Sequence, residues 1–222
     1  MSSLRQQFIA FSIESGVLRF GSYVTKAGRS SPYFFNAGLF CDGESLGRLA
    51  DFYSQTLLEA GVEFDMLFGP AYKGIALASA TAVSLAAKGR NVPFAFNRKE
   101  AKDHGEGGNI IGASLKGRVV IIDDVISAGT SVRESVEIIR AAGATPAAVL
   151  ISLDRMERAG RDGELSTLSA VQEVTRSEGI PVVAIANLDD LFAYLSSQGT
   201  SEEIGQYREA VAAYRDRYGI GH

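Results

Sequence analysis

The chain contains very little cysteine, no tryptophan and no long apolar segment. Its single cysteine, Cys41, excludes an intrachain disulfide framework and indicates a reducing environment, where a lone thiol is most often structural. No apolar run approaches the roughly 20 residues that cross a bilayer. The segment from Met1 to Glu14 is amphipathic and lacks the basic start and apolar core of a signal peptide. We therefore expect a soluble, cytoplasmic protein that has no membrane partner.

The chain also lacks an excess of charge of one sign. Its 22 basic and 26 acidic residues give a net charge of -4, which disfavours a nucleic-acid or anionic-membrane surface. It has no linker, no low-complexity segment and no repeat at solenoid periods. A chain of 222 residues can bury a substantial core, so it forms either one large α/β domain or a core with a small cap.

The apolar pattern predicts alternating strands and helices along most of the chain. Helices are expected at 4–15, 44–60, 73–88, 131–142 and 166–178, with two more at the C-terminus. Strands are expected at 17–24, 32–37, 66–69, 93–97, 146–152 and 181–186, with a strand pair near 110–123. This order favours an α/β fold with a mostly parallel central sheet flanked by helices on both faces. Ligands bind such sheets beyond the carboxyl ends of the strands.

The most informative segment runs from Val119 to Ser131. Four apolar β-branched residues form a buried strand, two carboxylates (Asp123 and Asp124) end it, and a small-residue loop leads into a helix. A helix N-terminus favours an anion, Gly129 lets the backbone approach it, and the two carboxylates offer acceptors for a sugar diol. The predicted phosphate-and-ribose residues are Asp123, Asp124, Val125, Ile126, Ser127, Ala128, Gly129, Thr130 and Ser131. An ordinary capped strand-to-helix junction is the alternative.

Two familiar nucleotide motifs are missing from this segment. No lysine follows its glycine, and no G-x-G-x-x-G follows a strand, so ATP hydrolysis and dinucleotide binding are both disfavoured.

A second strand-to-helix loop runs from Gly69 to Gly74. Its small residues admit a phosphate near the main chain, and Lys73 supplies a point charge next to Tyr72. The alternative is a tight turn with Lys73 in solvent.

The polar segment from Arg98 to Asn109 carries four groups that can be cationic: Arg98, Lys99, Lys102 and His104. These groups repel one another unless an anion of high charge lies among them, and glycines at 105, 107 and 108 can serve as hinges. By composition alone, a solvated surface loop is an equally good interpretation.

Four further segments, with the 119–131 motif, resemble the type I phosphoribosyltransferases, and among them the bacterial orotate phosphoribosyltransferases, in the same order over nearly the whole length. They are Lys26–Gly38, Phe68–Gly74, Phe96–Gly107 and Ser152–Arg155. The resemblance implies one phosphoribosyltransferase domain over 1–222, with a cap at about 1–40 and a flexible active-site loop at about 98–109. Where this family usually has threonine the chain has Ser127, which keeps the hydroxyl and loses a methyl group, so binding is expected to persist.

The resemblance also implies a reaction and a site. Orotate displaces pyrophosphate from phosphoribosyl pyrophosphate (PRPP), giving orotidine 5'-monophosphate for UMP synthesis. Mg²⁺ is the implied cofactor, held mainly by substrate oxygens and water, with no metal ligands predicted in the chain. The loop at 98–109 closes over the site and reaches a partner subunit, which implies a homodimer with shared active sites.

Residue roles follow by position from the same resemblance. Lys26 reaches PRPP, Phe34 and Phe35 contact the orotate ring, and Arg155 meets the orotate carboxylate. The 69–74 loop, with Tyr72 and Lys73, cradles the pyrophosphate, often through a cis peptide. The catalytic candidates are Lys73, Lys102, His104 and Asp124, while Arg98 and Lys99 bind the leaving group. On residues alone, Arg155 is more commonly a surface arginine that flanks a helix beside Glu157, and Tyr33 and Phe35 share a core-facing side of a strand.

Two competing functions remain. A phosphoribosyltransferase for a purine calls for another base pocket, whereas Arg155 and the 33–36 segment fit an acidic pyrimidine. A regulatory protein that senses PRPP without catalysis requires a nucleic-acid-binding extension or basic face, which this chain lacks.

Overall fold

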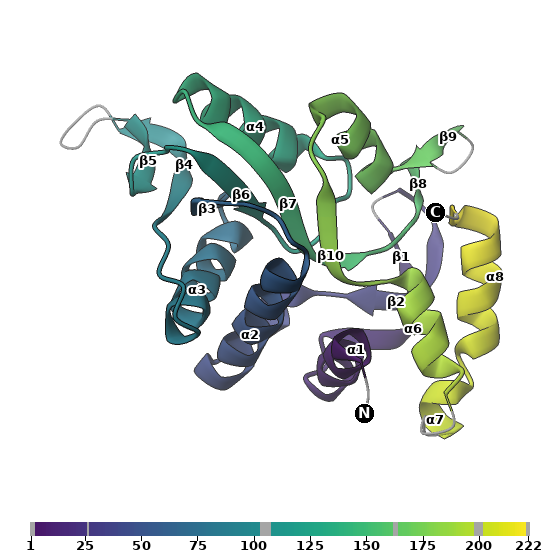
Figure 1. Cartoon of the computed structure of the whole chain (residues 1–222). Helices are drawn as coiled ribbons and strands as arrows, with labels where there is room; N and C mark the ends of the chain where they lie inside the picture. Colours follow the sequence, from purple (N-terminus) through teal and green to yellow (C-terminus); the bar gives the residue numbers. More distant parts are fainter. Residues whose placement is uncertain (1–2, 26, 103–107, 162–163, 198–201, 221–222) are drawn as a thin grey trace.

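A six-stranded sheet occupies the centre of the computed structural model, which describes residues 3–25, 27–102, 108–161, 164–197 and 202–220 (Figure 1). Its strands are Met66–Gly69 (β3), Phe94–Lys102 (β4), Gly108–Gly112 (β5), Arg118–Ile122 (β6), Thr145–Asp154 (β7) and Val182–Asn187 (β10), in the order β10-β7-β6-β3-β4-β5. Neighbouring strands are parallel except β4 and β5, which are antiparallel. The predicted mostly parallel sheet is confirmed.

Helices cover both faces of the sheet because its central strands are buried on both sides. In β6, Val119 and Ile121 belong to one apolar cluster while Val120 and Ile122 belong to the other, as the period of two in a strand requires. The first cluster includes residues of Thr130–Ala141 (α4) and Ala170–Glu178 (α5). The second includes residues of Gly43–Glu59 (α2) and Lys73–Ala87 (α3), and Figure 1 shows these two helix pairs on opposite sides of the sheet.

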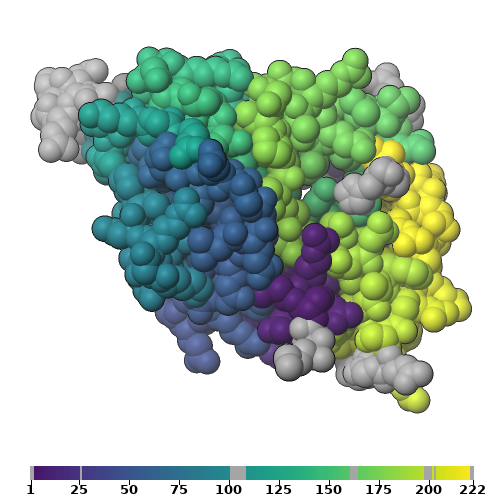
Figure 2. All heavy atoms as spheres, in the orientation of Figure 1, coloured from purple at the N-terminus to yellow at the C-terminus, as the bar shows by residue number. Residues whose placement is uncertain are grey.

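The N-terminal segment packs against the same core as the sheet. It consists of Leu4–Glu14 (α1) and an antiparallel pair, Leu18–Val24 (β1) and Ser30–Phe35 (β2). The ring centroids of Phe8 and Phe52 lie 5.4 Å apart, which ties α1 to α2. Figure 2 shows α1, in purple, seated between α2 and Leu188–Leu195 (α6). The boundary of a cap at about residue 40 stays a prediction, because one apolar cluster runs through both parts.

Several elements differ from the sequence expectation. The helix expected from 166 starts at Ala170, because Ser169 caps it and residues Glu164–Ser169 form a strand (β9) that pairs with Arg158–Arg161 (β8). The strand expected to end at 97 extends to Lys102, because β5 pairs with it there. The C-terminus holds three described helices rather than two: α6, Glu202–Gly205 (α7) and Arg208–Tyr218 (α8). A short 3-10 helix, Ala37–Leu39, was also not expected. The pairings of β8 with β9 and of β4 with β5 could not be predicted from local periodicity, because each strand's partner lies in another segment.

Over the described residues, no helix has the length and apolar character needed to cross a membrane. Cys41, expected to be structural, is an exposed free thiol.

Candidate active site

The two adjacent carboxylates lie at the carboxyl end of β6 and are nearly buried. Asp123 accepts a hydrogen bond from Ser131 Oγ at 3.1 Å, and its other oxygen accepts from the Asp124 N–H at 2.9 Å. The main chain beneath them is fixed by two buried hydroxyls, since Tyr53 donates to the Asp123 carbonyl at 2.7 Å and Ser152 donates to the Asp124 carbonyl at 2.6 Å. These contacts hold the two carboxylates in place at the carboxyl end of the central strand β6.

The loop after these carboxylates leads directly into α4. Gly129 has φ +72°, a conformation that favours glycine, and α4 begins at Thr130. A Cβ at Gly129 would lie 2.6 Å from Val174 Cγ2, so a larger residue would also collide with α5. Ser127, Ala128 and Thr130 are exposed, while Val125, Ile126 and Ser131 are at least partly buried. This arrangement presents a helix N-terminus and exposed hydroxyls to solvent, as an anion site requires.

The second loop approaches the first at the carboxyl end of the adjacent strand β3. Lys73 Nζ lies 2.5 Å from Asp124 Oδ2, so the lysine predicted to bind phosphate faces the carboxylate predicted to bind ribose. The peptide bond between Ala71 and Tyr72 is cis. The alternative of Lys73 in free solvent is wrong, although its side chain is half exposed.

Glycines allow this loop to cross close to the strand that carries the carboxylates. A Cβ on Gly69 would lie 2.1 Å from the Gly74 carbonyl oxygen, and a Cβ on Gly74 would lie 2.8 Å from the Ile122 carbonyl oxygen. Asn97 of β4 accepts a hydrogen bond from the Ala71 N–H at 2.8 Å and so links the loop to a third strand. The ends of three adjacent strands are thereby joined.

The predicted cationic segment begins on β4 beside this loop. Lys99 is exposed and its Nζ lies 5.2 Å from the centre of the Tyr72 ring, while Arg98 is half-buried. The side chain of Lys102, together with Lys26 and His104, lies outside the described residues.

The aromatic segment of β2 divides its side chains between core and surface. Tyr33 and Phe35 are buried, whereas Phe34 is exposed and stacks on Tyr23 with ring centroids 5.4 Å apart. The expected alternation along this strand is confirmed. Phe34 can offer its ring to a ligand, but the ring of Phe35 packs against Phe8 in the core.

Arg155 follows β7, directly beside β6 in the sheet. Its side chain is only 20% exposed, donates to Glu157 Oε1 from Nε at 2.7 Å, and lies over the Tyr33 ring at 4.9 Å. The contact with Glu157 was anticipated, but the interpretation of Arg155 as a surface arginine flanking a helix is wrong, because β8 follows and tertiary contacts bury it. Burial raises the pKa of Tyr33 well above its usual value, and the charge of Arg155 opposes that shift.

Burial also raises the pKa of Asp123, to about 6, and the neighbouring charge of Asp124 adds to the shift. Lys73 already offsets the charge of Asp124. The buried Asp123 carboxylate therefore favours a ligand group that donates a hydrogen bond.

Sequence reasoning missed several residues that hold this site. The sequence pattern places Tyr53 only within an expected helix, and it gives Ser152 and Asn97 no role beyond membership of the resembling segments. No local pattern reveals their partners, which lie 70, 28 and 26 positions away.

A cavity of about 360 Å³ lies between the β1–β2 pair and α8, and none of the predicted substrate residues lines it. Among the described residues, no group of three or more His, Cys, Asp or Glu side chains is placed to hold a metal ion.

The fold, with its two strand-end loops, is that of a type I phosphoribosyltransferase. Residues 42–177 match the family described as phosphoribosyl transferase domain, more than half of the chain. The chain is 73% identical over 220 residues to orotate phosphoribosyltransferase of Herminiimonas arsenicoxydans, covering 99% of this chain and 100% of the relative. The protein of that name from Ralstonia pickettii is 69% identical, over 99% of this chain and 97% of the relative.

A solved structure agrees with these sequence matches. The crystal structure of orotate phosphoribosyltransferase from Francisella tularensis has a TM-score of 0.84 and 39% identity, covering 96% of this chain and 100% of that one. At this similarity, the chain belongs to the bacterial orotate phosphoribosyltransferases.

Proposed function

We propose that this chain transfers the phosphoribosyl group of PRPP to orotate, forming orotidine 5'-monophosphate and pyrophosphate in UMP biosynthesis. The observation that carries the proposal is the meeting of two strand-end loops, where Lys73 contacts Asp124 at 2.5 Å. One loop offers carboxylates and a helix N-terminus for the ribose phosphate, and the other offers small residues and a cation for the pyrophosphate.

The reaction forms one bond and breaks another at the same carbon. The ring nitrogen of orotate bonds to C1 of the ribose and gives up its proton, while the bond from C1 to oxygen breaks and its electron pair leaves with pyrophosphate, whose oxygen accepts that proton. A transition state of this kind gains from orientation of the reactants, neutralisation of the leaving group and exclusion of water.

The carboxylates accept hydrogen bonds from the ribose hydroxyls. Asp123 already accepts a hydrogen bond from Ser131, which orients its carboxylate before the ligand binds. Asp124 exchanges Lys73 for a ribose hydroxyl, which frees the lysine for the pyrophosphate oxygens. Residues 125–131 bind the 5'-phosphate with main-chain N–H groups and the hydroxyls of Ser127 and Thr130.

The cations on and after β4 neutralise the departing pyrophosphate. Lys99 lies next to the Tyr72 ring, close to the loop that holds Lys73. Lys102 and His104 follow, with Lys102 assisting departure directly, while Arg98 and Lys26 complete the charge around PRPP.

Mg²⁺ is the proposed cofactor. The donor set fits it only as a partly ligand-held ion, because Asp123 and Asp124 supply hard oxygens but no third protein carboxylate or histidine joins them among the described residues. When bound, the ion supplies charge neutralisation at the pyrophosphate oxygens.

Arg155 is the proposed partner of the orotate carboxylate. Its planar guanidinium matches a planar carboxylate, and it is largely buried beside Tyr33. Phe34 offers its exposed ring to the base, and Phe35 can contribute only main-chain groups because its side chain is in the core.

The assay that tests the reaction is the loss of orotate ultraviolet absorbance on mixing protein, orotate, PRPP and Mg²⁺. Uracil and hypoxanthine serve as parallel acceptors. We expect turnover with orotate as the acceptor but not with uracil or hypoxanthine, and no turnover in the absence of Mg²⁺. Turnover with hypoxanthine would move the substrate to a purine, and PRPP binding without any turnover would favour the regulatory alternative.

A cytoplasmic homodimer with shared active sites is also proposed, supported by the single free thiol and by the exposed side chain of Lys99 on β4. Light scattering after gel filtration would measure the mass, and cell fractionation would measure the location.

Mixing Lys102→Ala with Asp124→Ala subunits would test whether the two subunits share their active sites. If the loop acts on the partner's site, about half of the dimers are mixed and each mixed dimer carries one intact site of two, so about a quarter of the activity returns. No recovery would contradict sharing.

A further inference from the structure

Glu157 lies between two guanidinium groups at the edge of the proposed orotate site. Its Oε1 atom accepts from Arg155 Nε at 2.7 Å and lies 2.6 Å from Arg155 Nη2. Its Oε2 atom lies 3.4 Å from Nη1 of Arg29. One carboxylate thus bridges an arginine proposed to touch the substrate and a second arginine that has no role in the reaction.

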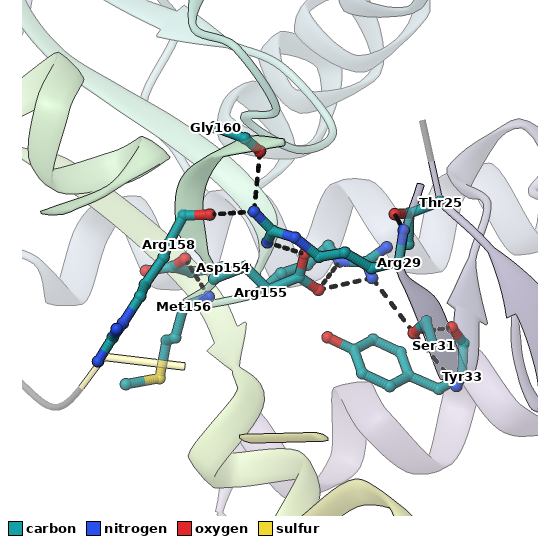
Figure 3. Close-up of polar contacts among 10 residues, drawn as sticks. Thr25, Arg29, Ser31, Tyr33, Asp154, Arg155, Met156, Arg158 and Gly160 are labelled. Carbon is teal, nitrogen blue, oxygen red and sulfur yellow. Dashed lines mark hydrogen bonds and ion pairs between the residues drawn. The ribbon is translucent and has the colours of Figure 1, made fainter. Parts of the chain in front are cut away.

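The second arginine is anchored by the fold. Arg29 is 2% exposed, and its Nη2 donates to the carbonyl oxygens of Arg158 and Gly160, each at 2.8 Å (Figure 3). Its guanidinium also lies 5.2 Å from the centre of the Tyr218 ring of α8. Arg29 therefore joins the β1–β2 pair to β8 and the C-terminal helix, and offers Glu157 a fixed partner.

The backbone next to Arg155 is also held in place. Met156 has φ +50°, an uncommon conformation for a residue with a side chain, and its N–H donates to Asp154 Oδ1 at 2.8 Å. The Ile220 N–H donates to the Met156 carbonyl at 3.0 Å, and Gly219 forms a bridge with Glu157. The backbone that carries Arg155 is thus held by Asp154 on one side and by residues 219 and 220 on the other.

We propose that Glu157, fixed by Arg29, is a positioning residue that holds the Arg155 guanidinium for the carboxylate of the pyrimidine substrate. The inference rests on the proposed function. Glu157 occupies the edge formed by Nε and Nη2, so the substrate carboxylate meets the end of the guanidinium. Ser31 Oγ lies 3.4 Å from Nη2 and Tyr33 supports the guanidinium plane, which leaves the group little rotational freedom.

Glu157 also sets the charge of the site. Without it, two guanidinium groups with 2% and 20% side-chain exposure would repel each other, and Arg155 would turn away or take another anion. With it, recognition depends on the planar fit of a carboxylate to an oriented fork rather than on net positive charge. The expected consequence is selectivity for orotate over bases that lack the carboxylate.

The test compares Glu157→Ala and Glu157→Gln with the wild type and with Glu178→Ala. Glu178 is a matched control, because its side chain is 12% exposed against 15% for Glu157 and it pairs with Arg140 elsewhere on the surface. The measurements are KM for orotate, kcat, Kd for PRPP by calorimetry, and the inhibition constant of uracil.

We expect Glu157→Ala to raise KM for orotate about tenfold, as loss of a charge-assisted hydrogen bond does, with Kd for PRPP and the uracil constant unchanged. Glu157→Gln keeps one acceptor but loses the charge that offsets the two guanidinium groups, and its amide NH2 would face a donor, so it should recover only part of this loss. Glu178→Ala should match the wild type.

Equal losses for orotate, PRPP and uracil would overturn the proposal and assign Glu157 a structural role. An unchanged KM for orotate would overturn it as well. If Glu157→Ala does not fold, Glu157→Asp replaces it: one methylene shorter, it cannot reach both arginines, and it should raise KM for orotate alone. A wild type that does not use orotate would instead refute the proposed function before any variant is compared.

Discussion

At the residue scale, the acidity of Asp123 links the site to stability. Its pKa in the folded protein is raised to about 6 by burial and by Asp124, while an unfolded aspartate titrates near 4. Between about pH 4 and pH 6 the folded state therefore binds more protons than the unfolded state, and the free energy of unfolding rises as the pH falls, by up to about 1.4 kcal/mol per pH unit.

The measurement is urea unfolding of the ligand-free protein at several pH values from 7 to 5. Asp123→Asn should remove the contribution of Asp123 to the slope of the unfolding free energy against pH. Asp216→Asn, at an exposed site on α8, should retain that contribution. An identical slope in the Asp123→Asn protein would assign the pH dependence to other groups.

Arg155→Lys probes the guanidinium fork at the same scale. A lysine keeps the charge but cannot bind Glu157 along one edge and a carboxylate at its end. We expect orotate affinity to fall about tenfold, with PRPP affinity retained, as measured by calorimetry for each substrate. Equal weakening of both ligands would mean that Arg155 supports the fold only.

Lys102→Ala separates binding from turnover. The contact of Lys102 with pyrophosphate should strengthen as pyrophosphate leaves. The substitution should therefore lower kcat about a hundredfold, and this loss should exceed the loss of orotate affinity. Lys116→Ala removes an exposed lysine on the loop before β6 and serves as the control. Steady-state kinetics would test this, and an unchanged kcat would remove Lys102 from the mechanism.

At the element scale, the crossing of the β3–α3 loop over the end of β6 depends on glycine. Gly74→Ala would place a Cβ 2.6 Å from Pro70 and 2.8 Å from the Ile122 carbonyl, and should destabilise the protein by about 1–3 kcal/mol. Gly47→Ala, in an exposed turn of α2 with nothing within 4 Å, should stabilise it by up to about 1 kcal/mol. Thermal unfolding of both variants measures the contrast, and similar shifts would contradict the proposed crowding.

Element prediction succeeded where the local pattern was strong. The buried strand β6 and the amphipathic helix α4 are predicted to within a residue or two, because both periods are read directly from apolar spacing. The pair β8–β9 was missed because Arg158–Arg161 and Glu164–Ser169 are short and mostly polar. Their pairing is stabilised by contacts such as that from Arg29, which the local sequence does not contain.

At the scale of the whole molecule, one apolar cluster joins the N-terminal segment, the sheet and α8. We therefore expect a single cooperative unfolding transition, with calorimetric and van't Hoff enthalpies that agree for each assembled unit. Scanning calorimetry at several protein concentrations measures this and separates subunit dissociation from unfolding. A separate early transition would show that the first 40 residues form an independent cap.

The fold alone does not select the base. Adenine phosphoribosyltransferase from Leishmania donovani, at 19% identity, has a TM-score of 0.53 to this chain, which shows a shared fold only. Selection of the base must therefore come from side chains such as Arg155 and Phe34, and from the groups that orient them.

Local sequence is sufficient to predict the strand-to-helix loops, the adjacent carboxylates and the family to which they belong, because these features are contiguous in the chain. The contacts of Lys73 with Asp124, 51 positions away, and of Glu157 with Arg29, 128 positions away, are seen only in the folded protein. Such pairs form when separate segments bury their apolar faces against one core. Their partners are therefore set by packing and topology rather than by local pattern.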